Sequence, residues 1–191
     1  MKTCFCILSI VLLFGCTDVN KGINRDMQTS TVNVDDKYNP QAKLDSLGVT
    51  LRDQGIPVAN YVHAVRSGNL LFLAGKGPKQ ANGENIVGKL GKDLSIDEGY
   101  AAAREVAINQ LSVLKMELGN LNRIKRIVKV HGMVNAMPDF TDHSKVINGY
   151  SDLMVAVFGE NGKHARAAVG MGSLPGNMAV EVEMIVEVYE E

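Results

Sequence analysis

The sequence predicts an α+β fold in which one mixed sheet carries two helices packed on a single face. Segments with strand character alternate with segments of helical period in the order β-β-α-β-α-β-β. Ser95 and Glu98 have the spacing of a capping box at the start of the first helix. The segment at 178–189 alternates apolar and polar side chains, as a strand with one buried face does. These observations indicate a sheet that is covered by helices on one side only.

The elements follow from local patterns. Gly68 interrupts two apolar runs and predicts a hairpin turn, and Gly119 and Gly159 follow the two helical segments as terminators. The turn at 174–177 predicts a second hairpin that joins the last two strands. Strands are expected at 61–66, 70–75, 126–136, 165–173 and 178–189, and helices at 95–119 and 142–158.

Composition limits the possible partners. The chain has 191 residues, of which 46% are hydrophobic and 21% charged, and its formal net charge is −1. This mixture excludes disorder throughout and a fibrous repeat, and favours one folded domain. A near-neutral charge gives no overall attraction to phosphate, so no nucleic-acid partner is expected unless a local basic patch provides one.

The first residues have the pattern of an export signal. Residues 1–15 contain Lys2 followed by an apolar run that is too short to span a bilayer as a helix, which is typical of a signal peptide. The sequence at 13–16, Leu-Phe-Gly-Cys, resembles a bacterial lipobox, in which the cysteine becomes lipidated after cleavage. We therefore expect an exported lipoprotein, periplasmic or anchored in the outer membrane through a lipid on Cys16. The alternative is an ordinary cleaved signal in which Cys16 is incidental.

A polar stretch separates this signal from the folded unit. Residues 16–46 show neither hydrophobic period, and we expect the lipidated cysteine to be followed by a flexible tether. The folded domain is then expected at 47–191. All three cysteines, Cys4, Cys6 and Cys16, precede it, so the sequence predicts no disulfide and no thiol nucleophile in the domain.

The uncovered face of the predicted sheet has a mixed character. In the last strand, Val182 and Met184 share the face that meets the helices, whereas Glu181, Glu183 and Ile185 share the other face. A face that is half polar and half apolar suits a subunit interface that encloses polar groups better than it suits a core. The sequence therefore predicts oligomerisation.

Common catalytic motifs are missing from the sequence. The four histidines lack metal-ligand spacing, and no phosphate-binding loop, dinucleotide-binding glycine pattern or serine-nucleophile motif occurs. We therefore expect neither a metal nor a cofactor.

One pair of charged residues stands out. Arg166 opens a strand that is otherwise small and apolar, so its guanidinium needs a partner. In a hairpin with an odd register sum, Arg166 and Glu181 share one face and lie roughly 7–8 Å apart on the diagonal. Arg166 could then grip a substrate carboxylate while Glu181 holds or activates a water. The alternative is a salt bridge with only a structural role.

At this hairpin the sequence resembles a known family. Ala165-Arg166, Leu174-Pro175 and the segment 180–185 resemble the C-terminal signature of the RidA/YjgF family, the reactive-intermediate deaminases that are also labelled endoribonuclease L-PSP. Further matches are Tyr61, the turn 67–69, Ala74-Gly75 followed by Gly77-Pro78, and the segment 146–150 on the second helix.

The resemblance implies a chorismate-mutase-like fold assembled as a homotrimer, with clefts between subunits. It also implies hydrolysis of enamines and imines such as 2-aminoacrylate to a 2-keto acid and ammonia, without metal or cofactor. Carried over by position, Arg166 would bind the substrate carboxylate and Glu181 would position the attacking water and move protons. Tyr61, Gly75 and Asn148 would line the cleft.

The chain departs from the family pattern at two positions. His164 and Ala168 stand where the family often has proline and cysteine. His164 is either a second proton carrier at the mouth of the cleft or an exposed turn residue. Because the familiar aminoacrylate arises in the cytoplasm, an exported chain would need another substrate.

Other functions therefore stay open. One is a carboxylate-binding trimer without turnover. Another is an endoribonuclease, suggested by the family label and by Arg123, Lys125 and Lys129, which share strand parity, although a solvated strand face also explains those charges.

Overall fold

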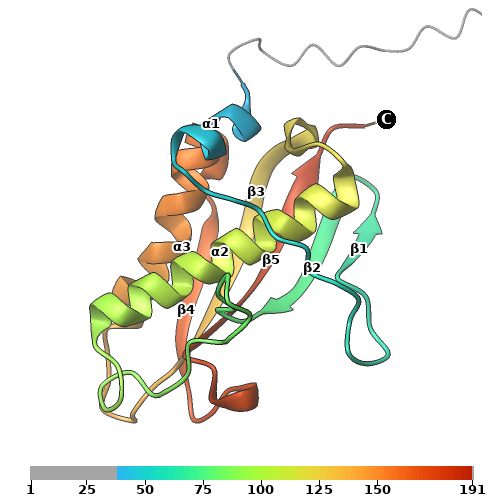
Figure 1. The fold of residues 1–191 in the computed structure, drawn as a ribbon. Coiled ribbons are helices and arrows are strands. Elements are labelled where there is room, and N and C mark those ends of the chain that lie inside the picture. Colours follow the sequence, from blue (N-terminus) through green and yellow to red (C-terminus); the bar gives the residue numbers. More distant parts are fainter. Residues whose placement is uncertain (1–37, 191) are drawn as a thin grey trace, which may run out of the picture. The chain divides into compact units, whose positions relative to one another are not determined.

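The structure is a computed structural model, and it describes residues 38–190 (Figure 1). The predicted signal peptide at 1–15, the lipidation site at Cys16 and the tether as far as residue 37 lie outside the described residues. Within the described range, no helix has both the length and the apolarity that a membrane crossing requires.

A single five-stranded sheet forms the centre of the domain. Its spatial order is β1-β2-β5-β3-β4, and β3 and β4 run parallel while the other neighbours are antiparallel. The strands are β1 (Ala64–Ser67), β2 (Leu70–Lys76), β3 (Ile124–Asn135), β4 (Ala165–Met171) and β5 (Val180–Val188).

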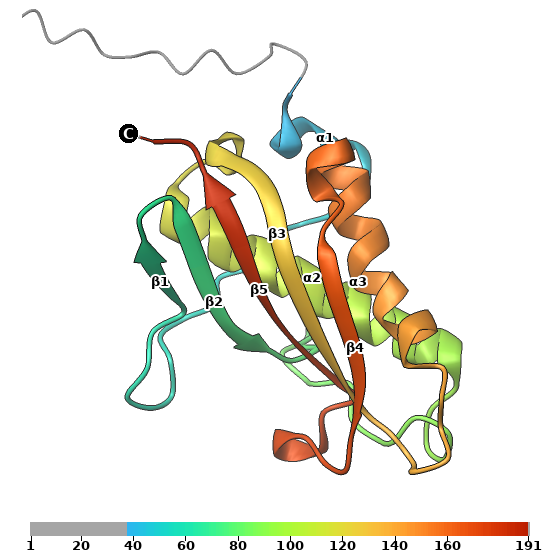
Figure 2. The ribbon, with the colours of Figure 1, turned by 180° about the vertical axis from the view of Figure 1, so that it is seen from behind.

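Both long helices cover the same face of this mixed sheet. They are α2 (Ile96–Leu118) and α3 (His143–Phe158), and no helix of residues 38–190 covers the opposite face (Figures 1 and 2). The predicted α+β class and element order are thereby confirmed. Short 3₁₀ turns occupy Leu121–Arg123, Gly159–Gly162 and Pro175–Asn177.

The capping residues behave as their spacing predicts. Glu98 N donates to Ser95 Oγ at 3.3 Å, and Ser95 N donates to Glu98 Oε2 at 2.8 Å, so the capping box of α2 is complete. Gly119 ends α2 with φ of 70°, and Gly159 ends α3 with φ of 59°.

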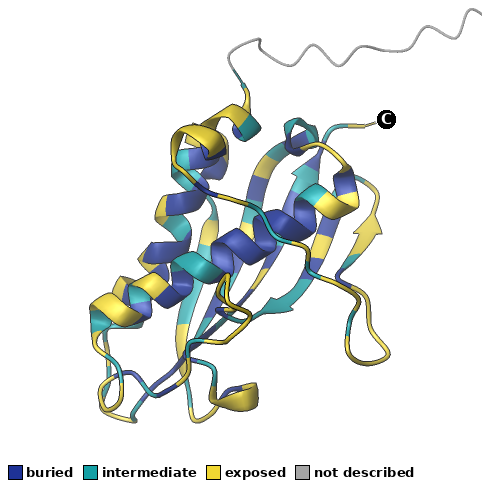
Figure 3. Cartoon of the chain, in the orientation of Figure 1, coloured by how far each residue is buried: buried dark blue, intermediate teal, exposed yellow. Residues whose placement is uncertain are grey.

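The core lies between the sheet and its two helices (Figure 3). Alternate residues of β5 point into it, and the residues between them face away from the helices. The fully buried side chains include Leu111 of α2, Ile147 of α3 and Val182 of β5. The division of β5 into an inner and an outer face matches the sequence prediction.

The predicted pairing of the last two strands is wrong. Among the described strands β4 pairs with β3 alone, and β5 lies on the other side of β3, between β3 and β2. β3, α3 and β4 form a βαβ unit, whose crossover helix makes the two strands parallel and places them side by side. After β4 the chain crosses β3, and β5 takes the central position in the sheet. The apolar inner face of β5 is fully covered there.

A short helix extends the folded unit toward the N-terminus. α1 (Pro40–Ser46) begins after Asn39, whose side chain accepts from Ala42 N at 3.0 Å. Leu44 is completely buried, and Tyr38 Oη donates to the Ile124 carbonyl at 2.8 Å. The domain therefore includes residues 38–46, which the sequence analysis assigned to the tether, because so short a helix shows no readable period.

The register of β2 against β5 shifts between Leu73 and Lys76. This bulge is supported from the core side by Gln110 of α2, whose Nε2 donates to the carbonyls of Ala74 at 3.1 Å and Val182 at 2.8 Å. Since a bulge re-aims the residues that follow it, this irregularity sets the position of Gly75.

Candidate functional site

The arginine cluster consists of Arg166, Asn148 and Ser151 at the edge of the sheet. Arg166 pairs with buried Val130 and so lies on the helix-covered face of β4. Its Nη1 donates to Asn148 Oδ1 at 2.9 Å and to Ser151 Oγ at 3.0 Å, and its Nη2 donates to the Ser144 carbonyl at 3.5 Å. α3 therefore holds the guanidinium of the neighbouring strand.

These contacts leave one edge of the guanidinium uncommitted. Both Nη1 hydrogens are accepted by α3, while Arg166 Nε–H has no hydrogen-bond acceptor among residues 38–190. The edge formed by Nε and Nη2 is a bidentate donor that matches the two oxygens of a carboxylate. Arg166 also lines a pocket of about 230 Å³ together with Ser151, Val155, Lys163 and His164.

His164 is tied into this cluster through both ring nitrogens. Nδ1 lies 2.7 Å from the Gly162 carbonyl, and Nε2 lies 3.0 Å from Ser151 Oγ. Burial lowers the pKa of His164; the hydrogen bond to Gly162 opposes this effect, and the positive charge of Arg166 adds a smaller lowering. The ring is partly buried, so the interpretation as an exposed turn residue is wrong.

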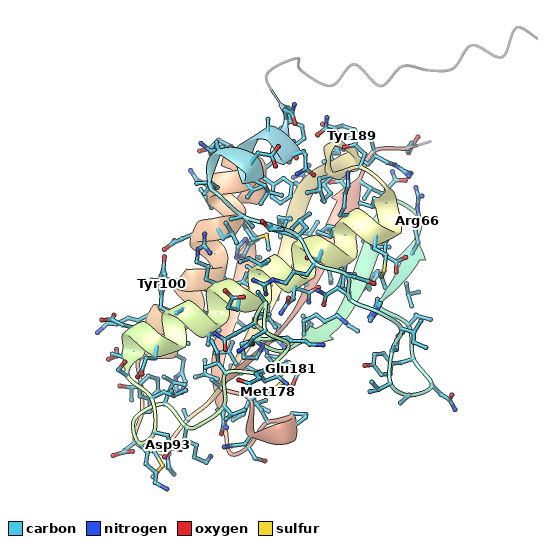
Figure 4. All side chains as sticks on the ribbon, in the orientation of Figure 1. Arg66, Asp93, Tyr100, Met178, Glu181 and Tyr189 are labelled. Atoms are coloured by element: carbon cyan, nitrogen blue, oxygen red, sulfur yellow. The ribbon has the colours of Figure 1, made fainter. Side chains whose placement is uncertain are left out.

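The glutamate cluster consists of Glu181, Gly75, Gly77 and Met178, on the other side of the sheet. Glu181 and Met178 lie near one end of the sheet (Figure 4). Glu181 Oε1 occupies the space that a Cβ on Gly75 would need, and Met178 Sδ does the same at Gly77. Burial and the nearby charge of Glu183 raise the pKa of Glu181.

The two clusters do not meet within one chain. Glu181 alternates with buried Val180 and Val182, so it lies on the face without helices, whereas Arg166 lies on the helix-covered face. β3 also separates their strands. The predicted shared face was wrong because the register argument assumed a hairpin that the chain does not form.

The other predicted cleft residues divide between the two sides. Asn148 contacts Arg166 directly, and Gly75 contacts Glu181. Tyr61 precedes β1, and its exposed fraction is 49%. Since β1 and β4 are opposite edges of the sheet, Tyr61 lies far from the arginine cluster of its own chain.

The sheet face without helices is hollowed and chemically mixed. A depression of about 510 Å³ combines aromatic, aliphatic and charged side chains. Within it, His131 Nδ1 lies 3.1 Å from Glu183 Oε1. Its side-chain lining includes Phe72, Lys129, His131, Ala167, Glu183 and Ile185.

The basic residues at the start of β3 do not form a shared strand face. Arg123 belongs to a 3₁₀ turn before β3, and its Nη1 donates to the Leu118 carbonyl at 3.3 Å. Lys125 and Arg126 both pair with Glu187, at 2.7 and 2.8 Å. The pattern that suggested an RNA-binding surface is therefore wrong for Arg123. Among the described residues, no group of histidine and acidic side chains could hold a metal ion.

Sequence reasoning missed two members of these clusters. Ser151 could have been found, because it stands three residues after Asn148 and so shares its helix face. Met178 carries no such signal, since its contact with Gly77 depends on the loop that joins β4 to β5.

Comparison with known proteins assigns this fold to a class. Residues 41–188 match the family described as "YjgF/chorismate mutase-like, putative endoribonuclease". The chain therefore belongs to the YjgF family, and its sheet with helices on one face is the chorismate-mutase-like fold of that family, as the sequence predicted.

Individual relatives agree with this assignment. The chain is 46% identical over 147 residues to protein TCP17 of Trypanosoma cruzi, covering 76% of this chain and 92% of the relative. It is 32% identical over 136 residues to the RutC family protein PH0854 of Pyrococcus horikoshii, covering 71% and 90%.

Solved structures show the same likeness. The protein Atu1372 of Agrobacterium tumefaciens, of unknown function, has 41% identity and a TM-score of 0.73, covering 78% of this chain and 94% of that one. A protein from Shewanella oneidensis has 32% identity and a TM-score of 0.75, covering 78% and 99%.

Proposed function

We propose that this protein is a hydrolytic deaminase of small enamine and imine carboxylates, which it converts to a 2-keto acid and ammonia. The observation that carries the proposal is the hydrogen bonding of the Arg166 guanidinium. Its guanidinium is anchored through Nη1, lines a small pocket, and keeps Nε without an acceptor among residues 38–190. The edge formed by Nε and Nη2 recognises a planar carboxylate with two parallel hydrogen bonds.

The proposed site is shared between copies of the chain in a homotrimer. Arg166 belongs to the edge strand β4 and contacts Asn148 of α3, whereas Glu181 lies on the helix-free face, so a neighbour's β4 edge would have to meet that face. A repeated head-to-tail contact of this kind forms a ring when its rotation closes, and a homotrimer is such a ring of three copies. The mixed lining of the helix-free face suits such a contact.

The chemistry needs one water and proton transfer. With an enamine, protonated Glu181 gives its proton to the terminal carbon, which produces the imine. A water held by the Glu181 carboxylate then attacks the imine carbon and gives one proton to that carboxylate, which passes it to the nitrogen. The C–N bond breaks as the C=O bond forms, ammonia leaves, and the hydroxyl proton returns to Glu181, which is again protonated.

The electrostatics of Glu181 support this role. Its raised pKa brings the protonated and ionised forms closer in population near neutral pH than they are for an ordinary carboxyl group. Arg166 would hold the substrate so that its imine carbon faces the water, which lowers the barrier by orientation. The steps consume one water and require no oxidant or reductant.

We further propose that the chain works outside the cytoplasm, anchored through a lipid on Cys16. The support is the sequence pattern at 1–16. Changing Cys16→Ser should move the protein from the membrane fraction to the soluble fraction. Retention in the membrane fraction would contradict the anchor.

The deaminase assay uses imines that an amino-acid oxidase generates in solution. The purified domain should accelerate keto-acid release, and Arg166→Ala should lower that rate to the uncatalysed level. Arg66→Ala, at the distant hairpin, is the matched control and should keep full activity. Equal rates with and without the wild-type domain would refute the proposal.

Calorimetry with pyruvate separates a binding protein from an enzyme. Saturable binding that Arg166→Ala removes, together with no turnover of any imine, would identify a carboxylate-binding protein. Light scattering checks the trimer independently, since a monomeric mass would leave the site without its second half.

A further inference from the structure

A chain of hydrogen bonds runs from Arg166 through Ser151 to His164. Arg166 Nη1 donates to Ser151 Oγ at 3.0 Å, and Ser151 Oγ lies 3.0 Å from His164 Nε2. His164 Nδ1 lies 2.7 Å from the Gly162 carbonyl. These hydrogen bonds thus link β4, α3 and the 3₁₀ turn that precedes β4.

The Gly162 carbonyl, at the end of this series, fixes the direction in which the hydrogen bonds are donated. The Gly162 carbonyl can only accept, so the 2.7 Å contact requires a hydrogen on His164 Nδ1. In the neutral imidazole, Nε2 is then an acceptor, and it takes the hydroxyl hydrogen of Ser151. The lone pairs of Ser151 Oγ are left to accept from Arg166. Donation therefore runs from Arg166 to Ser151, then to His164 and finally to Gly162.

The surroundings of His164 favour its neutral form. The charged groups beside it are Arg166 and Lys163, and Lys163 Nζ pairs with Glu160 at 2.7 Å. α3 presents Ser151 and Val155 to the same pocket and contributes no charge there. Burial and the adjacent guanidinium act together to lower the pKa of His164.

We propose that His164 is a positioning residue for Arg166. Its bare Nε2 orients the Ser151 hydroxyl so that Asn148 and Ser151 together accept both Nη1 hydrogens, which directs the Nε and Nη2 edge toward a ligand carboxylate. The inference deepens the proposed function and rests on Arg166 as the carboxylate anchor. His164 acts through Ser151, so it affects binding without touching the ligand.

The test measures pyruvate affinity by calorimetry in the full assembled protein. His164→Leu and Ser151→Ala should each weaken binding by about fivefold, which is the effect of losing one neutral hydrogen bond. The double variant should bind pyruvate no more weakly than either single variant, because both changes break the same series of hydrogen bonds. His164→Gln should restore most of the affinity, since its Oε1 can accept from Ser151. Met116→Ala, at an exposed position of α2 that does not line the pocket, is the control and should bind as the wild type does.

A second measurement does not depend on the ligand. In the unliganded protein, ¹⁵N chemical shifts of His164 should show hydrogen on Nδ1 and a bare Nε2. The Arg166 Nε–Hε resonance should broaden in His164→Leu and sharpen again in His164→Gln. Hydrogen on Nε2, or an unchanged Arg166 resonance in folded His164→Leu, would overturn the inference.

The outcomes separate this inference from the proposed deaminase. Pyruvate binding without turnover would refute the deaminase and leave the positioning role intact. Additive losses in the double variant, or a His164→Gln variant as weak as His164→Leu, would overturn the positioning role and leave the deaminase untouched. Failure of the wild type to bind pyruvate, or equal binding by Arg166→Ala, would refute both.

Discussion

Arg166 and Glu181 lie on opposite faces of one sheet, with β3 between the strands that carry them. Arg166 reaches α3 on the helix-covered face, while Glu181 covers Gly75 on the helix-free face. No rotation of either side chain brings them together through a packed sheet. A reaction that uses both residues therefore requires two copies of the chain.

This separation predicts complementation between two inactive variants. Arg166→Ala and Glu181→Gln should each lack deaminase activity when assembled alone. Unfolding and refolding them together in equal amounts should restore about a quarter of wild-type activity, because random assembly leaves about one interface in four with both native residues. Keto-acid release measures the recovery. A refolded mixture that stays as inactive as the separate variants would show that the two residues do not form a shared site.

The close approach of Glu181 to Gly75 predicts a second loss of activity. In Gly75→Ala the new methyl group displaces the Glu181 carboxylate, and a misplaced catalytic group lowers the rate by about 10- to 100-fold. Folding should survive, since the displaced atom is the end of a flexible side chain. Gly77→Ala is the matched control, because there the methyl group meets Met178 Sδ and leaves Glu181 in place. Equal rates in the two variants would contradict a role for the Glu181 position.

The sequence predicted the elements well because their signals are local. The capping box at Ser95, the terminating Gly119 and the alternation along β5 each depend on neighbouring residues. Strand pairing depends on contacts that are distant along the chain, and two strands joined by a short turn were assigned to a hairpin. Instead, the crossover through α3 pairs β4 with β3. Arg166 and Glu181 therefore do not share a face of the sheet, as the hairpin would have required.

The candidate site was predicted by resemblance more than by geometry. The resemblance selected Asn148, which does contact Arg166, and Gly75, which does contact Glu181. The roles of these residues stay predictions until they are tested. The link from Arg166 through Ser151 to His164 could not be derived from the sequence, because it depends on how α3 lies against β4.

The burial of Leu44 predicts that α1 is part of the cooperative fold. Leu44→Ala should lower the free energy of unfolding by about 2–5 kcal/mol, since it removes a fully buried side chain and leaves a cavity. Leu47→Ala, at the partly exposed end of the same helix, should change it by less than about 0.5 kcal/mol. Urea denaturation at one protein concentration compares them. Equal stability of the two variants would mean that residues 38–46 are not part of the cooperative fold.

The lowered pKa of His164 predicts a stability that depends on pH. The unfolded chain binds a proton at His164 near the ordinary pKa of about 6.5, whereas the folded chain binds it only at lower pH. This contribution to stability is therefore fully present above about pH 6.5 and is lost as the pH falls through the folded pKa. His164→Gln removes the titrating group and keeps an acceptor for Ser151. Urea denaturation between pH 7.5 and 5 should show a shallower loss of stability in His164→Gln than in the wild type, at the same protein concentration. Parallel curves would mean that folding does not lower the pKa of His164.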